Sequence, residues 1–101
     1  IASHHNLNNL ICIIDKNKST DRALKIDNLN LKFKSFGWNT ISIDGHSHKD
    51  IYKAVNIKSE KPLAIIANTV KGKGINFMEN NPEWHHKTLS QDLFNQIILK
   101  N

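Results

Sequence analysis

Cysteine and arginine are nearly missing from this sequence of 101 residues, and long apolar runs are missing altogether. Cysteine occurs once, as Cys12, which excludes an internal disulfide framework and fits a reducing compartment, so we expect a cytoplasmic protein. No apolar run approaches the roughly 20 residues needed to cross a membrane, and we expect no membrane partner. The length allows one small domain or a piece of a larger one.

Arginine also occurs only once, although the formal net charge is +5. Lysine (13 residues), asparagine (14) and isoleucine (14) dominate the composition. All three have A/T-rich codons, so genome composition explains much of the lysine. The sequence has no arginine-rich stretch, and its aromatic residues are not interleaved with lysines along one face. Both features are typical of nucleic-acid-binding proteins. Because the sequence lacks them, we expect no nucleic-acid partner.

The chain alternates apolar runs, polar turns and helix-like stretches. This alternation predicts an α/β fold, with a parallel sheet, flanking helices and right-handed crossovers. Three strands make a thin sheet, and the chain is too short to supply the helices for both faces, so we expect other chain to cover the edges. The expected strands are 10–15, 38–44 and 61–70, and the expected helices are 27–37, 48–59 and 90–100.

Capping residues and apolar spacing add detail to these elements. Asp27 and Gly37 are the expected caps of the first helix, and Ser90 is the expected N-cap of the last. The first strand is expected to be buried on both faces, and residues 71–89 are expected to form a long irregular loop. The residues expected to point inward are Ile51, Tyr52, Ala54 and Val55 in the second helix, and Leu93, Phe94, Ile97 and Ile98 in the third.

Polar or glycine-rich segments follow all three strands, and parallel sheets bind ligands at the carboxyl ends of their strands. In DKNKS, Asp15, Asn17 and Ser19 offer the hard oxygen ligands that Mg²⁺ or Ca²⁺ prefers, although an Asx turn at a strand exit uses the same residue types. In KGKG, two lysines and two glycines suit a phosphate, but the spacing is not that of a P-loop, and a solvated turn explains it equally well.

Histidine is the other residue type that invites a chemical interpretation. Zinc sites recruit spaced ligands, and only His46 and His48 have a plausible spacing, so we do not expect zinc. In NNPEWHHKT, residues 80–88, His85 and His86 are either functional or surface residues beside a buried Trp84. The six histidines are His4, His5, His46, His48, His85 and His86.

Three stretches, in this order and at these distances, carry a resemblance: ASHHNLNNLICIIDKNKS, FGWNTISIDGHSHKDI and IIANTVKGKGINFMENNPEWH. From Ile1 to about Leu99, the chain resembles the amino-terminal, diphosphate-binding section of transketolase, a thiamine-diphosphate enzyme. Residues 68–85 are the most specific part. The resemblance implies a thiamine-diphosphate-binding α/β fold. It also implies that residues 1–101 are the carboxyl-terminal part of a single domain that is incomplete at its amino end.

The resemblance implies roles for four residues. Asn17 aligns with the family's Mg²⁺-binding asparagine, and Ser19 aligns with a residue that donates its backbone carbonyl to the metal. Lys71 matches a lysine at the cofactor site. His85 matches a catalytic histidine that contacts cofactor and substrate and is implicated in proton transfer. Both roles are chemically reasonable. A metal ion can bridge oxygen ligands and a diphosphate, and a histidine can move protons on a sugar hydroxyl.

The sequence departs from the family in several places. His86 stands where the family has glycine, and a histidine costs more than glycine where φ is positive. The Gly-Asp-Gly motif, whose Asp is a direct Mg²⁺ ligand, is absent, as are earlier substrate-binding histidines and the pyrimidine-binding domain with its catalytic glutamate. Asp44 and His46, in IDGH, belong to a family feature to which we assign no chemical role. We therefore expect the 101 residues alone to be inactive.

Several functions stay open at this point. The first is a transferase that moves a two-carbon ketol unit between sugar phosphates, working as a homodimer or with a separate pyrimidine-binding subunit. The alternatives are a related enzyme of the deoxyxylulose-phosphate synthase type, a non-catalytic remnant, and an unrelated basic binding domain. The sugar belongs either to pentose phosphate metabolism or to a pathway that makes surface-polysaccharide precursors.

Overall fold

A computed structural model describes residues 1–19, 21 and 23–100. Thr20 and Arg22, in the polar loop expected after the first strand, lie outside the described residues, as does Asn101. The chain divides into two compact units, Ile1–Thr69 and Val70 onward. The first unit contains the sheet, and the second contains a loop, a short 3₁₀ helix and the last α-helix.

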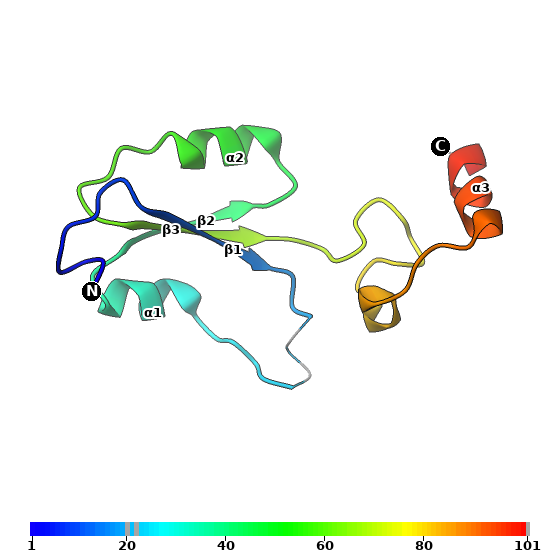
Figure 1. Cartoon of the computed structure of the whole chain (residues 1–101), viewed down its shortest axis with the longest axis horizontal. Coiled ribbons are helices and arrows are strands. Elements are labelled where there is room, and N and C mark those ends of the chain that lie inside the picture. Colours follow the sequence, from blue (N-terminus) through cyan, green and yellow to red (C-terminus); the bar gives the residue numbers. More distant parts are fainter. Residues whose placement is uncertain (20, 22, 101) are drawn as a thin grey trace. The chain divides into compact units, whose positions relative to one another are not determined.

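The sheet of the first unit has three parallel strands in the order β1-β3-β2 (Figure 1). Its strands are β1 (Ile11–Lys16), β2 (Asn39–Asp44) and β3 (Leu63–Asn68), close to the expected ranges. The β3 sequence LAIIAN is buried from Leu63 to Ala67, because this strand is central and has a helix over each face. The predicted α/β fold with parallel strands is confirmed.

Helices α1 (Leu29–Ser35) and α2 (His48–Val55) lie on opposite faces of the sheet (Figure 1). The strand order explains this placement. The chain moves two positions across the sheet from β1 to β2 and then one position back to β3. Because crossovers between parallel strands are right-handed, opposite directions of travel place the two connecting helices on opposite faces.

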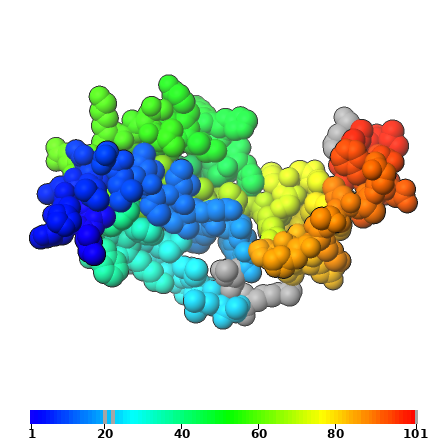
Figure 2. Space-filling view, viewed as in Figure 1, coloured from blue at the N-terminus to red at the C-terminus, as the bar shows by residue number. Residues whose placement is uncertain are grey.

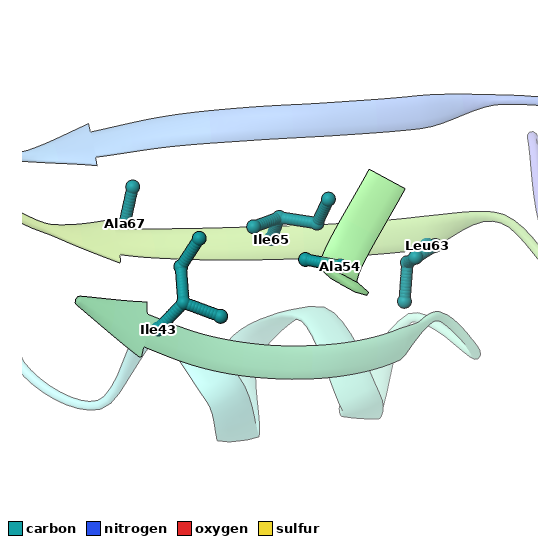
Figure 3. Packing of buried hydrophobic residues seen from close by; sticks show 5 residues of the cluster. All are labelled: Ile43, Ala54, Leu63, Ile65 and Ala67. Atoms are coloured by element: carbon teal, nitrogen blue, oxygen red, sulfur yellow. The ribbon is translucent and has the colours of Figure 1, made fainter. Parts of the chain in front are cut away.

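The core of this unit lies between β2, β3 and α2 (Figure 3). Ala54, the only buried residue of α2, is 1% exposed, and its small side chain lets the helix approach the sheet closely. Figure 2 shows the amino-terminal segment in blue and α2 in green at the surface of this unit, with little of β3 in view. The core residues are Ile43, Ala54, Leu63, Ile65 and Ala67.

The caps of α1 differ from the prediction. Asn28, not Asp27, is the N-cap: it adopts a left-handed conformation with φ of 44°, and its side chain accepts a hydrogen bond from the Leu31 amide at 3.2 Å. Asparagine tolerates this conformation better than most residues, so the helix begins at Leu29. Phe36 is the C-cap, and Gly37 follows it with φ of 84°.

Two expectations about burial in the first unit are wrong. Strand β1 is not buried on both faces: Ile13 is 59% exposed because β1 is an edge strand without a helix over that side. In α2, Tyr52 is 71% exposed, and Ile51 and Val55 are only partly covered. Of the four residues expected to point inward, only Ala54 lies in the buried core.

Helix α3 (Gln91–Lys100) forms where expected, and the Ser90 hydroxyl oxygen accepts a hydrogen bond from the Leu93 amide at 3.3 Å, as an N-cap does. Its apolar stripe is not buried, however, and Phe94 and Ile98 are exposed. Within the described residues of the second unit, the 3₁₀ helix η1 (Pro82–His85) is the only other helix, and there is no strand, so this unit offers little surface to cover α3. Among the described residues, no helix is long and apolar enough to span a membrane.

Candidate functional site

The carboxyl ends of the three strands meet at one edge of the sheet. Lys16 and Asp44, the last residues of β1 and β2, both pair in register with Asn68, the last residue of β3. The Thr69 amide donates to the Lys16 carbonyl at 3.3 Å, and the Gly45 amide donates to the Asn68 carbonyl at 2.8 Å. Because both bonds involve the end of β3, they bring together the polar segments that follow β1 and β2.

A hydrogen-bonded turn follows β1. The Ser19 amide donates to Asn17 Oδ1 at 2.9 Å, which is the bond of an Asx turn. Asn17 Nδ2 donates to Asp15 Oδ2 at 3.3 Å, and the Thr69 hydroxyl donates to the other oxygen, Oδ1, of the same carboxylate. The structure therefore brings Asn17 and Ser19 together, and it adds Thr69, which the sequence reasoning missed. The parallel register of β1 and β3 could have pointed to Thr69, because it places the residue after β3 beside the end of β1.

The donor atoms of this turn fit a hard cation. A carboxamide oxygen has two lone pairs, and the Ser19 amide uses only one of those on Asn17. An amide oxygen and a backbone carbonyl are ligands that Mg²⁺ and Ca²⁺ accept, but these cations take about six or more oxygen ligands. In the described part of the chain, no group of three or more His, Cys, Asp or Glu side chains is arranged to hold a metal. Asn17 and Ser19 would thus supply part of a coordination shell.

Asp44 has a structural task at the end of β2. Its Oδ1 accepts a hydrogen bond from the His46 amide at 2.9 Å, and its own amide donates to Asp50 Oδ2 at 3.3 Å. Ser47 then caps α2, since its hydroxyl oxygen accepts from the Asp50 amide at 3.2 Å. These contacts shape the turn from strand to helix.

The KGKG segment opens a closed loop in the second unit. The Asn80 amide donates to the Lys71 carbonyl at 2.9 Å, which joins the two ends of the loop. Gly72, with φ of 75°, lies against the backbone of Met78, where an added Cβ would come within 2.5 Å of the Met78 carbonyl oxygen. Gly74 also has a positive φ, of 97°, but open space around it. Both glycines therefore suit the backbone conformation of the loop, and at Gly72 there is also no space for a side chain.

A 3₁₀ helix, η1 (Pro82–His85), follows within the stretch that was expected to be irregular throughout. Asn81 is its N-cap and accepts from the Glu83 amide at 3.1 Å, while Pro82 occupies the first turn, where its missing N–H costs nothing. Trp84 is half-buried and packs against Phe77, with ring centroids 5.4 Å apart. The turn signal Asn-Pro was visible in the sequence, but a four-residue helix has too little periodicity to be predicted.

The loop and η1 together bring Lys71 and His85 into contact. Lys71 Nζ lies within hydrogen-bonding distance of His85 Nδ1, although the residues are 14 positions apart. The ammonium group of Lys71 is the main cause that lowers the pKa of the exposed His85 below its ordinary value of 6.5, followed by neighbouring His86 and slight burial. The ring of His86 meets that of His85 edge-on, with centroids 4.3 Å apart. The φ of His86 is −128°, so histidine in place of the family's glycine causes no backbone strain.

Comparison with known proteins identifies the family. Residues 1–100 match the family described as transketolase, thiamine diphosphate binding domain. The chain belongs to the transketolase family. Human transketolase is 38% identical over 102 residues, which cover 96% of this chain and 16% of the human protein. One of the subunits of the apulose-4-phosphate transketolase of Phocaeicola vulgatus is 26% identical over 105 residues, covering 96% of this chain and 37% of that protein.

A solved structure supports the same conclusion. The crystal structure of transketolase from Campylobacter jejuni superposes with a TM-score of 0.86 at 30% identity, over 98% of this chain and 17% of that one. The chain thus spans about a sixth of the length of the human and Campylobacter transketolases. The predicted family and fold are confirmed, whereas the roles of Asn17, Ser19, Lys71 and His85 stay predictions.

Proposed function

We propose that this chain is the part of a transketolase that binds the metal ion and the diphosphate of thiamine diphosphate. The complete enzyme would transfer a two-carbon ketol unit between sugar phosphates. The observation that carries the proposal is the family match over residues 1–100, which includes all four residues assigned to the site. The relatives reported above are transketolases or part of one, which favours this reaction over that of a deoxyxylulose-phosphate synthase.

The proposed metal ligands are the side-chain oxygen of Asn17 and the backbone carbonyl of Ser19. The Asx turn supports this assignment, because it holds both residues in one short segment and leaves Asn17 Oδ1 with a lone pair. Mg²⁺, or another hard cation such as Ca²⁺, would neutralise part of the diphosphate charge. Asn17 therefore binds the cofactor through the metal.

The proposed cofactor contacts in the second unit are Lys71 and His85. Lys71 supplies a positive charge suited to a diphosphate, and His85 supplies a ring nitrogen that can donate to an oxygen of cofactor or substrate. Their mutual contact supports a joint role. When bound, thiamine diphosphate supplies the group that stabilises the carbanion, while the side chains of the chain bind and orient it.

We propose further that residues 1–101 are the carboxyl-terminal part of one diphosphate-binding domain. The missing Gly-Asp-Gly motif and the exposed side of β1 support this interpretation. The pyrimidine-binding part and its catalytic glutamate would come from a second copy of a longer chain or from a separate subunit. The single cysteine supports a cytoplasmic location.

Cofactor affinity tests the metal assignment. The protein that contains residues 1–101 is titrated with thiamine diphosphate at limiting Mg²⁺, and Asn17→Ala is compared with wild type. Loss of one oxygen ligand is expected to weaken cofactor binding by about tenfold or more, judged by the roughly 1.5–3 kcal/mol that a hydrogen bond to a charged group contributes. Asn8→Ala, in the amino-terminal segment, is the control. Equal affinity of the Asn17 variant and wild type would contradict the assignment.

A further inference from the structure

The contact between Lys71 and His85 has a direction that chemistry dictates. A lysine ammonium group has only N–H donors, so the lone pair of the contact has to come from His85 Nδ1. A histidine that accepts at Nδ1 is neutral and carries its one ring proton on Nε2. The contact is therefore compatible with one of the three protonation forms of the imidazole.

The surrounding charges favour the same form. Protonation of His85 would place a cation beside the Lys71 ammonium and next to His86, whose ring touches it. The neighbouring carboxylates are engaged elsewhere: Glu83 pairs with Lys87 at 3.5 Å, and Glu79 accepts from the Gly74 amide at 3.1 Å. The lowered pKa of His85 follows from these neighbours, with Lys71 as the largest cause.

We propose that Lys71 is a positioning residue that sets the protonation form of His85: its ammonium group occupies Nδ1, so that the imidazole is neutral and presents one N–H, on Nε2, to a bound ligand. The ligand group that Nε2 meets has to be an acceptor, such as a phosphate oxygen or the oxygen of a sugar hydroxyl. That it belongs to the cofactor or substrate rests on the function proposed above.

This arrangement limits how His85 can move a proton. With Nδ1 occupied and Nε2 protonated, the ring has no lone pair with which to take a proton from a substrate. If the Nε2–H bond breaks and its proton passes to a ligand oxygen, a second proton has to reach Nδ1 from Lys71, which becomes a neutral amine. The ring then exchanges one neutral form for the other, and no imidazolate is formed. Lys71 would thus serve as the source of the replacement proton.

Nuclear magnetic resonance of the ligand-free chain tests the proposal separately from any catalytic role. The chain is labelled with ¹⁵N at histidine, and long-range ¹H–¹⁵N spectra report the protonation of both ring nitrogens across a pH titration. His85→Ala identifies the signals. In wild type, Nε2 is expected to be protonated and Nδ1 unprotonated, with a titration midpoint below 6.5. In Lys71→Met, the midpoint is expected to rise and the Nδ1-protonated form to gain population.

Two further variants distinguish the role of the cation from a loss of local structure. Lys71→Arg keeps a charged, donor-only group and is expected to retain the wild-type pattern. Lys73→Met removes the other lysine of the KGKG segment and is the matched control, expected to leave His85 unchanged. The proposal is wrong if wild-type His85 is protonated on Nδ1 at neutral pH, or if Lys71→Met shifts neither the midpoint nor the ring-nitrogen signals.

Discussion

Asp15 shows how one side chain fixes the orientation of another. Its carboxylate only accepts hydrogen bonds, and it receives one from Thr69 and one from Asn17 Nδ2. The amide nitrogen of Asn17 therefore faces Asp15, and the amide oxygen faces the other way, towards the Ser19 amide. The atom proposed to bind metal is oriented by a residue that is not itself a proposed ligand.

The pKa of His85 is expected to depend on salt. Lys71 and His86 lower it through charge repulsion, and His85 is exposed, so added salt screens the repulsion and raises the pKa towards 6.5. The lowered pKa also makes the stability of the folded chain depend on pH. As the pH falls through 6.5, the unfolded chain takes up this proton before the folded chain does, so His85 lowers the free energy of unfolding over that window. Titrations of His85 at low and high salt measure the shift, and a midpoint independent of salt would contradict it.

Among the elements, β3 is central and β1 lies at the edge. The same truncation in the two strands should therefore lower the free energy of unfolding by different amounts. Ile65 is 1% exposed, and Ile65→Ala is expected to lower the free energy of unfolding by roughly 2–5 kcal/mol. Ile13, which pairs with Ile65 in register but is 59% exposed, is the matched control and should cost about 1 kcal/mol or less on truncation. Urea denaturation measures both, and similar losses would contradict the packing described here.

The loop that presents Lys71 provides a second comparison at this scale. Gly72→Ala adds a Cβ against the Met78 backbone at a positive φ, whereas Gly74→Ala meets the same kind of φ in open space. The left-handed conformation alone costs roughly 1–2 kcal/mol, and the collision adds to that for Gly72. Amide hydrogen exchange at Asn80, whose N–H bonds the Lys71 carbonyl, is expected to speed up more in Gly72→Ala. Equal exchange in both variants would show that the contact with Met78 does not matter.

The elements differ in how far the sequence could predict them. Strand β3 was predictable because an uninterrupted apolar run of this length, preceded by Pro62, suits a central parallel strand. The N-cap of α1 was not, because Asp27 and Asn28 both have capping side chains and only the backbone conformation distinguishes them. The Lys71–His85 contact depends on a closed loop, a 3₁₀ helix and the packing of Trp84, none of which has a sequence period.

For the whole molecule, the four residues with proposed roles fall in two units: Asn17 and Ser19 in the first, Lys71 and His85 in the second. The resemblance could name all four, because motifs keep their order along the chain. It could not give their surroundings, because Asp15, Thr69 and His86 act through contacts that only folding creates.

The 101 residues alone are expected to have no transketolase activity, because the Gly-Asp-Gly aspartate and the catalytic glutamate of the family are absent from them. The purified chain, with thiamine diphosphate, Mg²⁺, xylulose 5-phosphate and ribose 5-phosphate, should form no sedoheptulose 7-phosphate above a blank without protein. Turnover that His85→Ala abolishes would overturn this expectation.

The position of β1 also affects how the protein behaves at high concentration. Among the described residues, this strand pairs with β3 on one side only, and its sequence, ICIIDK, is rich in isoleucine. A row of unpaired backbone donors and acceptors beside exposed isoleucines is a template on which a strand of another molecule can add. We therefore expect the β1 edge to make the separate chain prone to aggregation.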